Sequence, residues 1–123
     1  MKKFQIASIP GDGIGKETVA AGRQVLDTVC AIHGGLSLEY LDIHWSCEYY
    51  KKNGKMMPDD GLETLRPCDA IYLGAVGYPG VPDHISLWGL LLPIRRTFEQ
   101  YINLRPVKLL EGVKSQLATL QPG

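Results

Sequence analysis

The sequence is poor in cysteine. Its 123 residues include three, Cys30, Cys47 and Cys68, and no two of them form a CxxC pair. Disulfide-held secreted domains and structural zinc sites depend on paired, closely spaced cysteines. The sequence therefore predicts neither a disulfide framework nor a zinc site, and we expect the protein to work in a reducing cytoplasm.

The sequence also lacks an excess of either charge and any long apolar run. Its 13 Lys and Arg residues balance 13 Asp and Glu residues, so the formal net charge is zero and no nucleic-acid partner is expected. The longest apolar run spans residues 87–94, far short of the about 20 residues that a membrane-spanning helix needs. The apolar stretch behind Lys2 and Lys3 ends at Pro10, too early for a signal peptide. We therefore expect no membrane association.

Short apolar segments alternate with helix-like segments along the chain, and this order predicts an α/β fold with a largely parallel sheet. Strands are expected over residues 4–9, 36–43, 70–73 and 102–108, helices over 16–32 and 87–101, and a short helix capped by residues 58–60 that ends near residue 65. Gly34 and Gly35 are expected to end the first helix, because glycine readily adopts the left-handed conformation of a helix cap. Residues 44–57 and 109–123 show no clear element.

Three glycines, Gly11, Gly13 and Gly15, follow the first predicted strand and open the first predicted helix. Glycine lets a backbone turn sharply and approach a ligand closely, and a helix amino terminus presents free N–H groups to an anion. The dinucleotide-binding fingerprint is GxGxxG, however, whereas this sequence has GxGxG followed by Lys16. Spacing alone therefore favours a plain strand-to-helix turn and leaves a cofactor site as the alternative.

Two arginines, Arg95 and Arg105, lie ten positions apart, one on the last predicted helix and one near the start of the last predicted strand. The planar guanidinium fork matches a carboxylate, so two forks that converge in a cleft would select a diacid. The alternative is a pair of surface arginines bound to Glu99 or Glu111. Without further context, the surface interpretation is favoured.

Three segments taken together supply further context for the two arginines. They are residues 9–17 (IPGDGIGKE), residues 74–77 (GAVG), and a third segment made of residues 91–96 (LLPIRR) and 103–107 (NLRPV). In this order and at this spacing they resemble the β-decarboxylating dehydrogenases of the isocitrate/isopropylmalate dehydrogenase family, which includes tartrate and D-malate dehydrogenases. The resemblance covers essentially the whole chain. It makes the diacid-binding interpretation of the arginines the favoured one.

The resemblance implies an isocitrate/isopropylmalate dehydrogenase-like fold, which is not a classical Rossmann fold and so accounts for the imperfect glycine fingerprint. It implies a two-domain subunit that forms a homodimer, with residues 1–123 as the amino-terminal part of the larger α/β domain. It also implies NAD and a divalent metal, Mg or Mn, with the catalytic residues and metal ligands downstream of this segment. On that expectation the segment alone is inactive.

The resemblance implies roles for nine residues of this segment. Substrate binding falls to Arg95, Arg105, Trp88 and Leu91, and cofactor binding to Ile14, Gly74, Ala75, Val76 and Gly77. No residue is assigned to catalysis, because the catalytic residues are expected downstream, and none is assigned to a metal, because the three histidines show no ligand spacing.

The choice of substrate is expected to depend on the segment before the first arginine. Isopropylmalate dehydrogenases carry an acidic residue in this stretch, where the sequence has Leu87 and Trp88. Bulk here would shrink the pocket and favour a four-carbon 2-hydroxy diacid, tartrate or D-malate, although both residues could instead be plain core packing. The alternatives are a 3-isopropylmalate dehydrogenase segment with an unusual pocket, or a truncated, non-catalytic binding domain.

Overall fold

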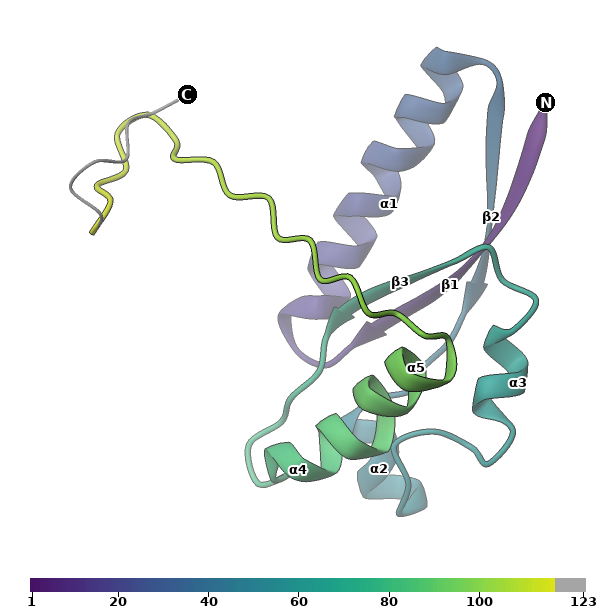
Figure 1. Cartoon of the computed structure of the whole chain (residues 1–123), viewed down its shortest axis with the longest axis vertical. Helices are drawn as coiled ribbons and strands as arrows, with labels where there is room; N and C mark the ends of the chain where they lie inside the picture. Colours follow the sequence, from purple (N-terminus) through teal and green to yellow (C-terminus); the bar gives the residue numbers. More distant parts are fainter. Residues whose placement is uncertain (117–123) are drawn as a thin grey trace.

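Three parallel strands form the centre of the computed structural model, which describes residues 1–116 (Figure 1). They are β1 (Lys2–Gly11), β2 (Leu36–Asp42) and β3 (Ala70–Ala75), in the sheet order β2-β1-β3. β1 therefore pairs with a strand on each side, and the carboxyl ends of all three strands meet at one edge of the sheet. The predicted α/β fold with a parallel sheet is confirmed.

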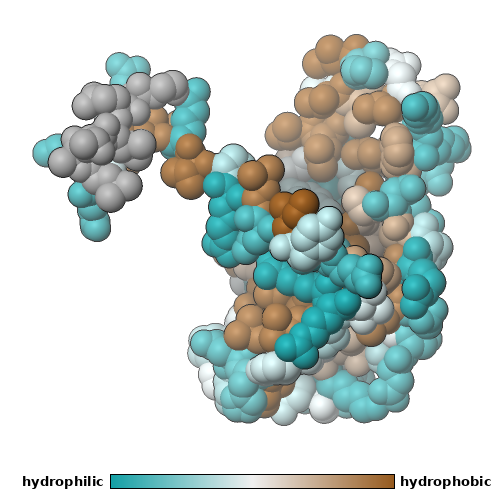
Figure 2. All heavy atoms as spheres, viewed as in Figure 1, coloured by the Kyte–Doolittle hydropathy of each residue, from teal (hydrophilic) through white to brown (hydrophobic). Residues whose placement is uncertain are grey.

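One face of the sheet is covered by α1 (Ile14–His33). Gly15 and Val19 are buried against the sheet, and Gly34 ends the helix in the left-handed conformation, as the sequence predicted. Apolar side chains also lie on the outer side of α1, where Val25, Leu26, Val29 and Ile32 are exposed (Figure 2). Within residues 1–116, no helix is both long enough and apolar enough to cross a membrane.

The opposite face of the sheet packs against five short helical segments. These are α2 (Cys47–Asn53), α3 (Gly61–Leu65), α4 (Asp83–Ser86), η1 (Leu87–Leu91) and α5 (Leu92–Thr97). The main core lies here, because Ala7 and Ile9 of β1 join a buried cluster with Trp45, Leu90 and Ile94. The result is three layers, with α1 on one side of the sheet and the short helices on the other.

The last three helical segments run on without a break and contain one wide π-helical turn, η1. In this turn the Leu92 N–H donates to the Leu87 carbonyl oxygen five residues earlier, the hydrogen bond that defines a π-helix. Pro93 explains the turn, because proline has no N–H and its ring crowds the carbonyl four residues before it, which belongs to Gly89. The predicted helix over residues 87–101 therefore begins earlier, at residue 83, and ends at residue 97.

The predicted strand over residues 102–108 is wrong. After α5 the chain is extended and runs away from the sheet, with no helix or strand from residue 98 to residue 116 (Figure 1). Ile102, Leu104 and Val107 are between 74% and 85% exposed. An apolar, alternating pattern forms a strand only beside a partner strand, and none lies next to this segment within residues 1–116. The rest of the prediction for residues 109–123, from 117 onward, falls outside the described residues.

Candidate functional site at the carboxyl edge of the sheet

The loops that follow β1 and β3 touch at the carboxyl edge of the sheet. The Asp12 N–H donates to the Ala75 carbonyl oxygen at 2.7 Å, which joins the two loops directly. A Cβ at Gly11 would collide with that same oxygen, and one at Gly74 would collide with the Pro10 carbonyl oxygen. The close approach that glycine permits here is therefore between two parts of the chain.

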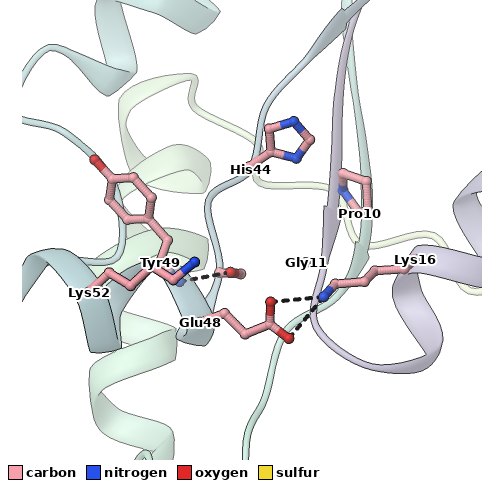
Figure 3. A pocket seen from close by; sticks show the side chains of 8 residues that line it. Pro10, Gly11, Lys16, His44, Glu48, Tyr49 and Lys52 are labelled. Atoms are coloured by element: carbon pink, nitrogen blue, oxygen red, sulfur yellow. Dashed lines mark hydrogen bonds and ion pairs between the residues drawn. The ribbon is translucent and has the colours of Figure 1, made fainter.

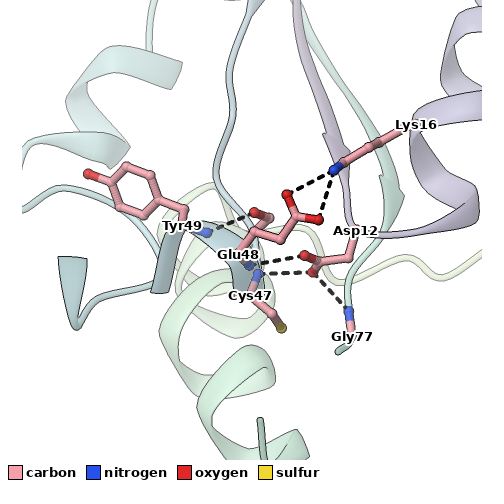
Figure 4. A network of polar contacts seen from close by, with 7 residues as sticks. Asp12, Lys16, Cys47, Glu48, Tyr49 and Gly77 are labelled. Atoms are coloured by element: carbon pink, nitrogen blue, oxygen red, sulfur yellow. Dashed lines mark hydrogen bonds and ion pairs between the residues drawn. The ribbon is translucent and has the colours of Figure 1, made fainter. Parts of the chain in front are cut away.

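The Asp12 side chain accepts hydrogen bonds from three backbone N–H groups on two segments at this edge (Figure 4). It is only 2% exposed, and its Oδ2 accepts hydrogen bonds from the Cys47 N–H at 2.9 Å and the Gly77 N–H at 3.2 Å. Its Oδ1 accepts from the Glu48 N–H at 3.1 Å. Cys47 and Glu48 open α2, so the carboxylate also lies at the positive end of that helix. Sequence reasoning passed over Asp12, although an acidic residue between two glycines after a strand was a usable signal.

The start of α2 has its own cap. The Ser46 Oγ accepts the Tyr49 N–H at 3.1 Å, as an N-cap serine typically does. Burial and the neighbouring Asp12 carboxylate raise the pKa of the Cys47 thiol to about 11, so this thiol is neutral near pH 7. It is a packed core group and not a nucleophile.

A pocket of about 480 Å³ opens beside this edge, between the end of β1, the loop after β2 and α2 (Figure 3). Its wall includes Pro10, Gly11, Lys16, His44, Ser46, Glu48, Tyr49 and Lys52. Across it, the Lys16 Nζ bonds both carboxylate oxygens of Glu48 at 2.8 Å, which raises the pKa of Lys16. None of the residues predicted for substrate or cofactor binding lines this pocket.

The residues predicted for cofactor binding lie around the junction of the two loops. Gly74 and Ala75 are the last residues of β3, and half-buried Val76 and exposed Gly77 follow them. Ile14 begins α1 and is 61% exposed. The glycine loop that leads to Ile14 is bonded to Ala75 and Gly77 through Asp12. Ile14 and residues 74–77 therefore lie at the same edge of the sheet.

The residues predicted for substrate binding fall into two parts. Arg95 is half-buried on α5, with half-buried Leu91 one turn before it. Arg105 is exposed on the extended segment, where its Nε contacts the Asn103 Oδ1 at 3.4 Å. Within residues 1–116, no hydrogen bond or ion pair joins Arg95 or Arg105 to the other or to a glutamate. In the described part of the chain, the surface ion pairs that were the alternative are thus absent, but the two arginines do not come together either.

Trp88 turns toward Arg96. The Arg96 guanidinium lies 4.9 Å from the centre of the Trp88 ring, eight positions earlier, a spacing that reflects the extra residue in η1. The indole is 57% exposed and borders a groove of about 500 Å³ whose other walls include Met56, Met57 and His84.

Comparisons with known proteins agree with this geometry. The family model for isocitrate/isopropylmalate dehydrogenases matches residues 5–122. The chain belongs to this family. A crystal structure of a β-decarboxylating dehydrogenase from Thermococcus kodakarensis, in its apo form, superposes with a TM-score of 0.59 at 28% identity, over 80% of this chain and 27% of that one. The predicted family fold is confirmed.

The similar relatives have more specific names. The chain is 58% identical over 118 residues to a probable tartrate dehydrogenase/decarboxylase of Bacillus subtilis, covering 95% of this chain and 33% of that protein. It is also 58% identical over 125 residues to a D-malate dehydrogenase (decarboxylating) of Escherichia coli, covering 100% of this chain and 34% of that protein. The chain thus spans about a third of the length of these curated relatives.

The packing at the loop junction predicts different costs for a methyl group at two nearby glycines. Gly74→Ala should lower the free energy of unfolding by about 1–3 kcal/mol, because its Cβ meets the Pro10 carbonyl and Val19. Gly77→Ala, where a Cβ meets nothing within 4 Å, should change it by less than about 0.5 kcal/mol. Urea unfolding followed by circular dichroism measures both, and equal losses would contradict the close approach.

Proposed function

We propose that this chain is the amino-terminal third of an NAD- and divalent-metal-dependent tartrate/D-malate dehydrogenase subunit. The observation that carries the proposal is the 58% identity, over 95% and 100% of this chain, to relatives named tartrate dehydrogenase/decarboxylase and D-malate dehydrogenase. The alternatives are a 3-isopropylmalate dehydrogenase segment or a non-catalytic binding domain, and neither of these two relatives has such a name.

The loop after β3 supports a cofactor site at the carboxyl edge of the sheet. Gly77 is exposed, and no atom lies within 4 Å of the position that a Cβ would take there. A bare backbone of this kind lets a flat ligand ring approach closely. The nicotinamide end of NAD would lie against Gly74–Gly77, with Ile14 bordering the same space from the start of α1.

Substrate recognition would depend on Arg95 and Arg105. A guanidinium binds a carboxylate through two parallel hydrogen bonds, and each charge-assisted bond contributes about 1.5–3 kcal/mol. Arg95 suits this role because it is half-buried and forms no ion pair within residues 1–116, so its fork is free for a ligand. Leu91, one turn before it, would supply the apolar wall that orients the bound diacid.

The cofactors would supply the chemistry, with NAD accepting the hydride and Mg²⁺ or Mn²⁺ polarising the forming ketone. Within residues 1–116, no group of three or more His, Cys, Asp or Glu side chains could hold a metal ion. By the family resemblance, the metal ligands would come from outside this part of the chain. This segment would bind and orient the substrate, and its subunit would pair with a second copy in a cytoplasmic homodimer.

The choice among diacids would be set near the start of η1. Leu87 is 42% exposed and Trp88 57% exposed, so their bulk is available to border a ligand. A large apolar surface would leave room for the substituents of tartrate or malate and would crowd the branched substituent of isopropylmalate.

The direct test is an assay of the complete subunit with NAD and Mg²⁺ or Mn²⁺. We expect kcat/KM for D-malate or tartrate to exceed that for 3-isopropylmalate by about 10-fold or more, since one or two misplaced methylene groups cost about 1–3 kcal/mol. A preference for 3-isopropylmalate would favour the first alternative, and no turnover with any of the three would favour the second.

Arg95→Lys should lower kcat/KM for the diacid by about 100-fold, because lysine keeps the charge but loses the two-pronged hydrogen bond. Arg96→Lys is the matched control, since Arg96 is the next residue on the same helix but stacks on Trp88. We expect it to cost less than about 10-fold. Steady-state kinetics of both variants would contradict the role of Arg95 if the two losses were alike.

Trp88→Ala should widen the substrate range toward malates with larger 3-substituents, because it removes the largest side chain at the start of η1. The measurement is the ratio of kcat/KM for 3-isopropylmalate to that for D-malate, which should rise about 10-fold. An unchanged ratio would mean that Trp88 only packs against Arg96 and the neighbouring groove.

A further inference from the structure

Residues 74–77, which are predicted to bind the cofactor, are bonded to the rest of the described chain by one side chain, the Asp12 carboxylate. Its Oδ2 lies 3.2 Å from the Gly77 nitrogen, and no other side-chain hydrogen bond within residues 1–116 reaches residues 74–77. Asp12 itself is held firmly, because its own N–H donates to Ala75 and its side chain is 2% exposed.

The same carboxylate is bound from the opposite side by α2. The Cys47 and Glu48 amides donate to it at 2.9 and 3.1 Å, so two donors from one rigid helix fix its position (Figure 4). Because Oδ2 is shared between Cys47 and Gly77, any shift of the carboxylate is passed on to Gly77.

We propose that Asp12 is a positioning residue for the cofactor: it holds the Gly77 backbone where the nicotinamide end of NAD would rest. The inference deepens the proposed function and rests on it. Asp12 touches neither cofactor nor substrate in this arrangement. Its contribution is to preorganise a loop of small residues, which would otherwise lose backbone freedom only when the cofactor binds.

This role predicts a selective effect on cofactor binding. In the complete enzyme, Asp12→Ala should raise the KM for NAD about 10-fold or more. The KM for the hydroxy acid should change less than about 3-fold, because Arg95 on α5 is not bonded to Asp12. Hydrogen exchange should be faster at the Gly77 amide in this variant.

Ser46→Ala is the matched control. It removes the side-chain cap of the same helix, the bond to the Tyr49 N–H, and leaves the Asp12–Gly77 bond in place. Exchange should quicken in the first turn of α2 and not at Gly77, and the KM for NAD should stay within about 2-fold. If Asp12→Ala does not fold, Asp12→Asn replaces it. Asparagine leaves one acceptor oxygen for three donors, so the Gly77 exchange rate and the KM for NAD should both rise in this variant.

The outcomes are separable. A Gly77 amide that exchanges equally in wild type and in the Asp12 variants overturns the inference. So does a rise of both KM values together, or a Ser46→Ala variant that behaves like Asp12→Ala, because Asp12 would then be merely structural. A wild-type enzyme that reduces no NAD overturns the proposed function, and with it the cofactor part of the inference, even if exchange still shows that Asp12 holds Gly77.

Discussion

The arrangement at the carboxyl edge of the sheet depends on one buried carboxylate. Removing the Asp12 charge from water costs several kcal/mol, and that cost must be offset by hydrogen bonds in place. The structure supplies three backbone N–H donors, two of them at the positive end of α2. Such a group stabilises only the one geometry in which all three donors converge. It therefore fixes where α2 and the loop after β3 lie relative to β1.

The glycines around Asp12 make this convergence possible. With no Cβ at Gly11 and Gly74, the two strand ends come close enough for the Asp12 and Ala75 backbones to bond directly. Dense main-chain contact leaves few side chains at the junction, so the exposed surface beyond it is bare backbone, as at Gly77. Tight packing inside and an open backbone surface outside thus have the same cause.

The sequence predicted elements whose causes are local and failed where the cause is distant. The end of α1 was readable because Gly34 carries its own conformational preference. α2 was missed because its seven residues have weak helical periodicity, and two of its first N–H groups are satisfied by Asp12, 35 and 36 positions away. Residues 102–108 have a strand-like pattern, but no strand of residues 1–116 lies beside them, and an unpaired pattern forms no sheet hydrogen bonds.

The predicted site residues were readable as a set only through family resemblance, and their geometry bears on how the site could work. Arg95 is held by a helix, whereas Arg105 lies on an extended segment and contacts only Asn103 through its side chain within residues 1–116. Ordering a free arginine costs about 2 kcal/mol of side-chain entropy, comparable to one charge-assisted hydrogen bond. Arg105 could therefore add to diacid binding only if other protein surface first fixed its segment. The exposed Ile102, Leu104 and Val107 give that segment the apolar side chains such packing would need.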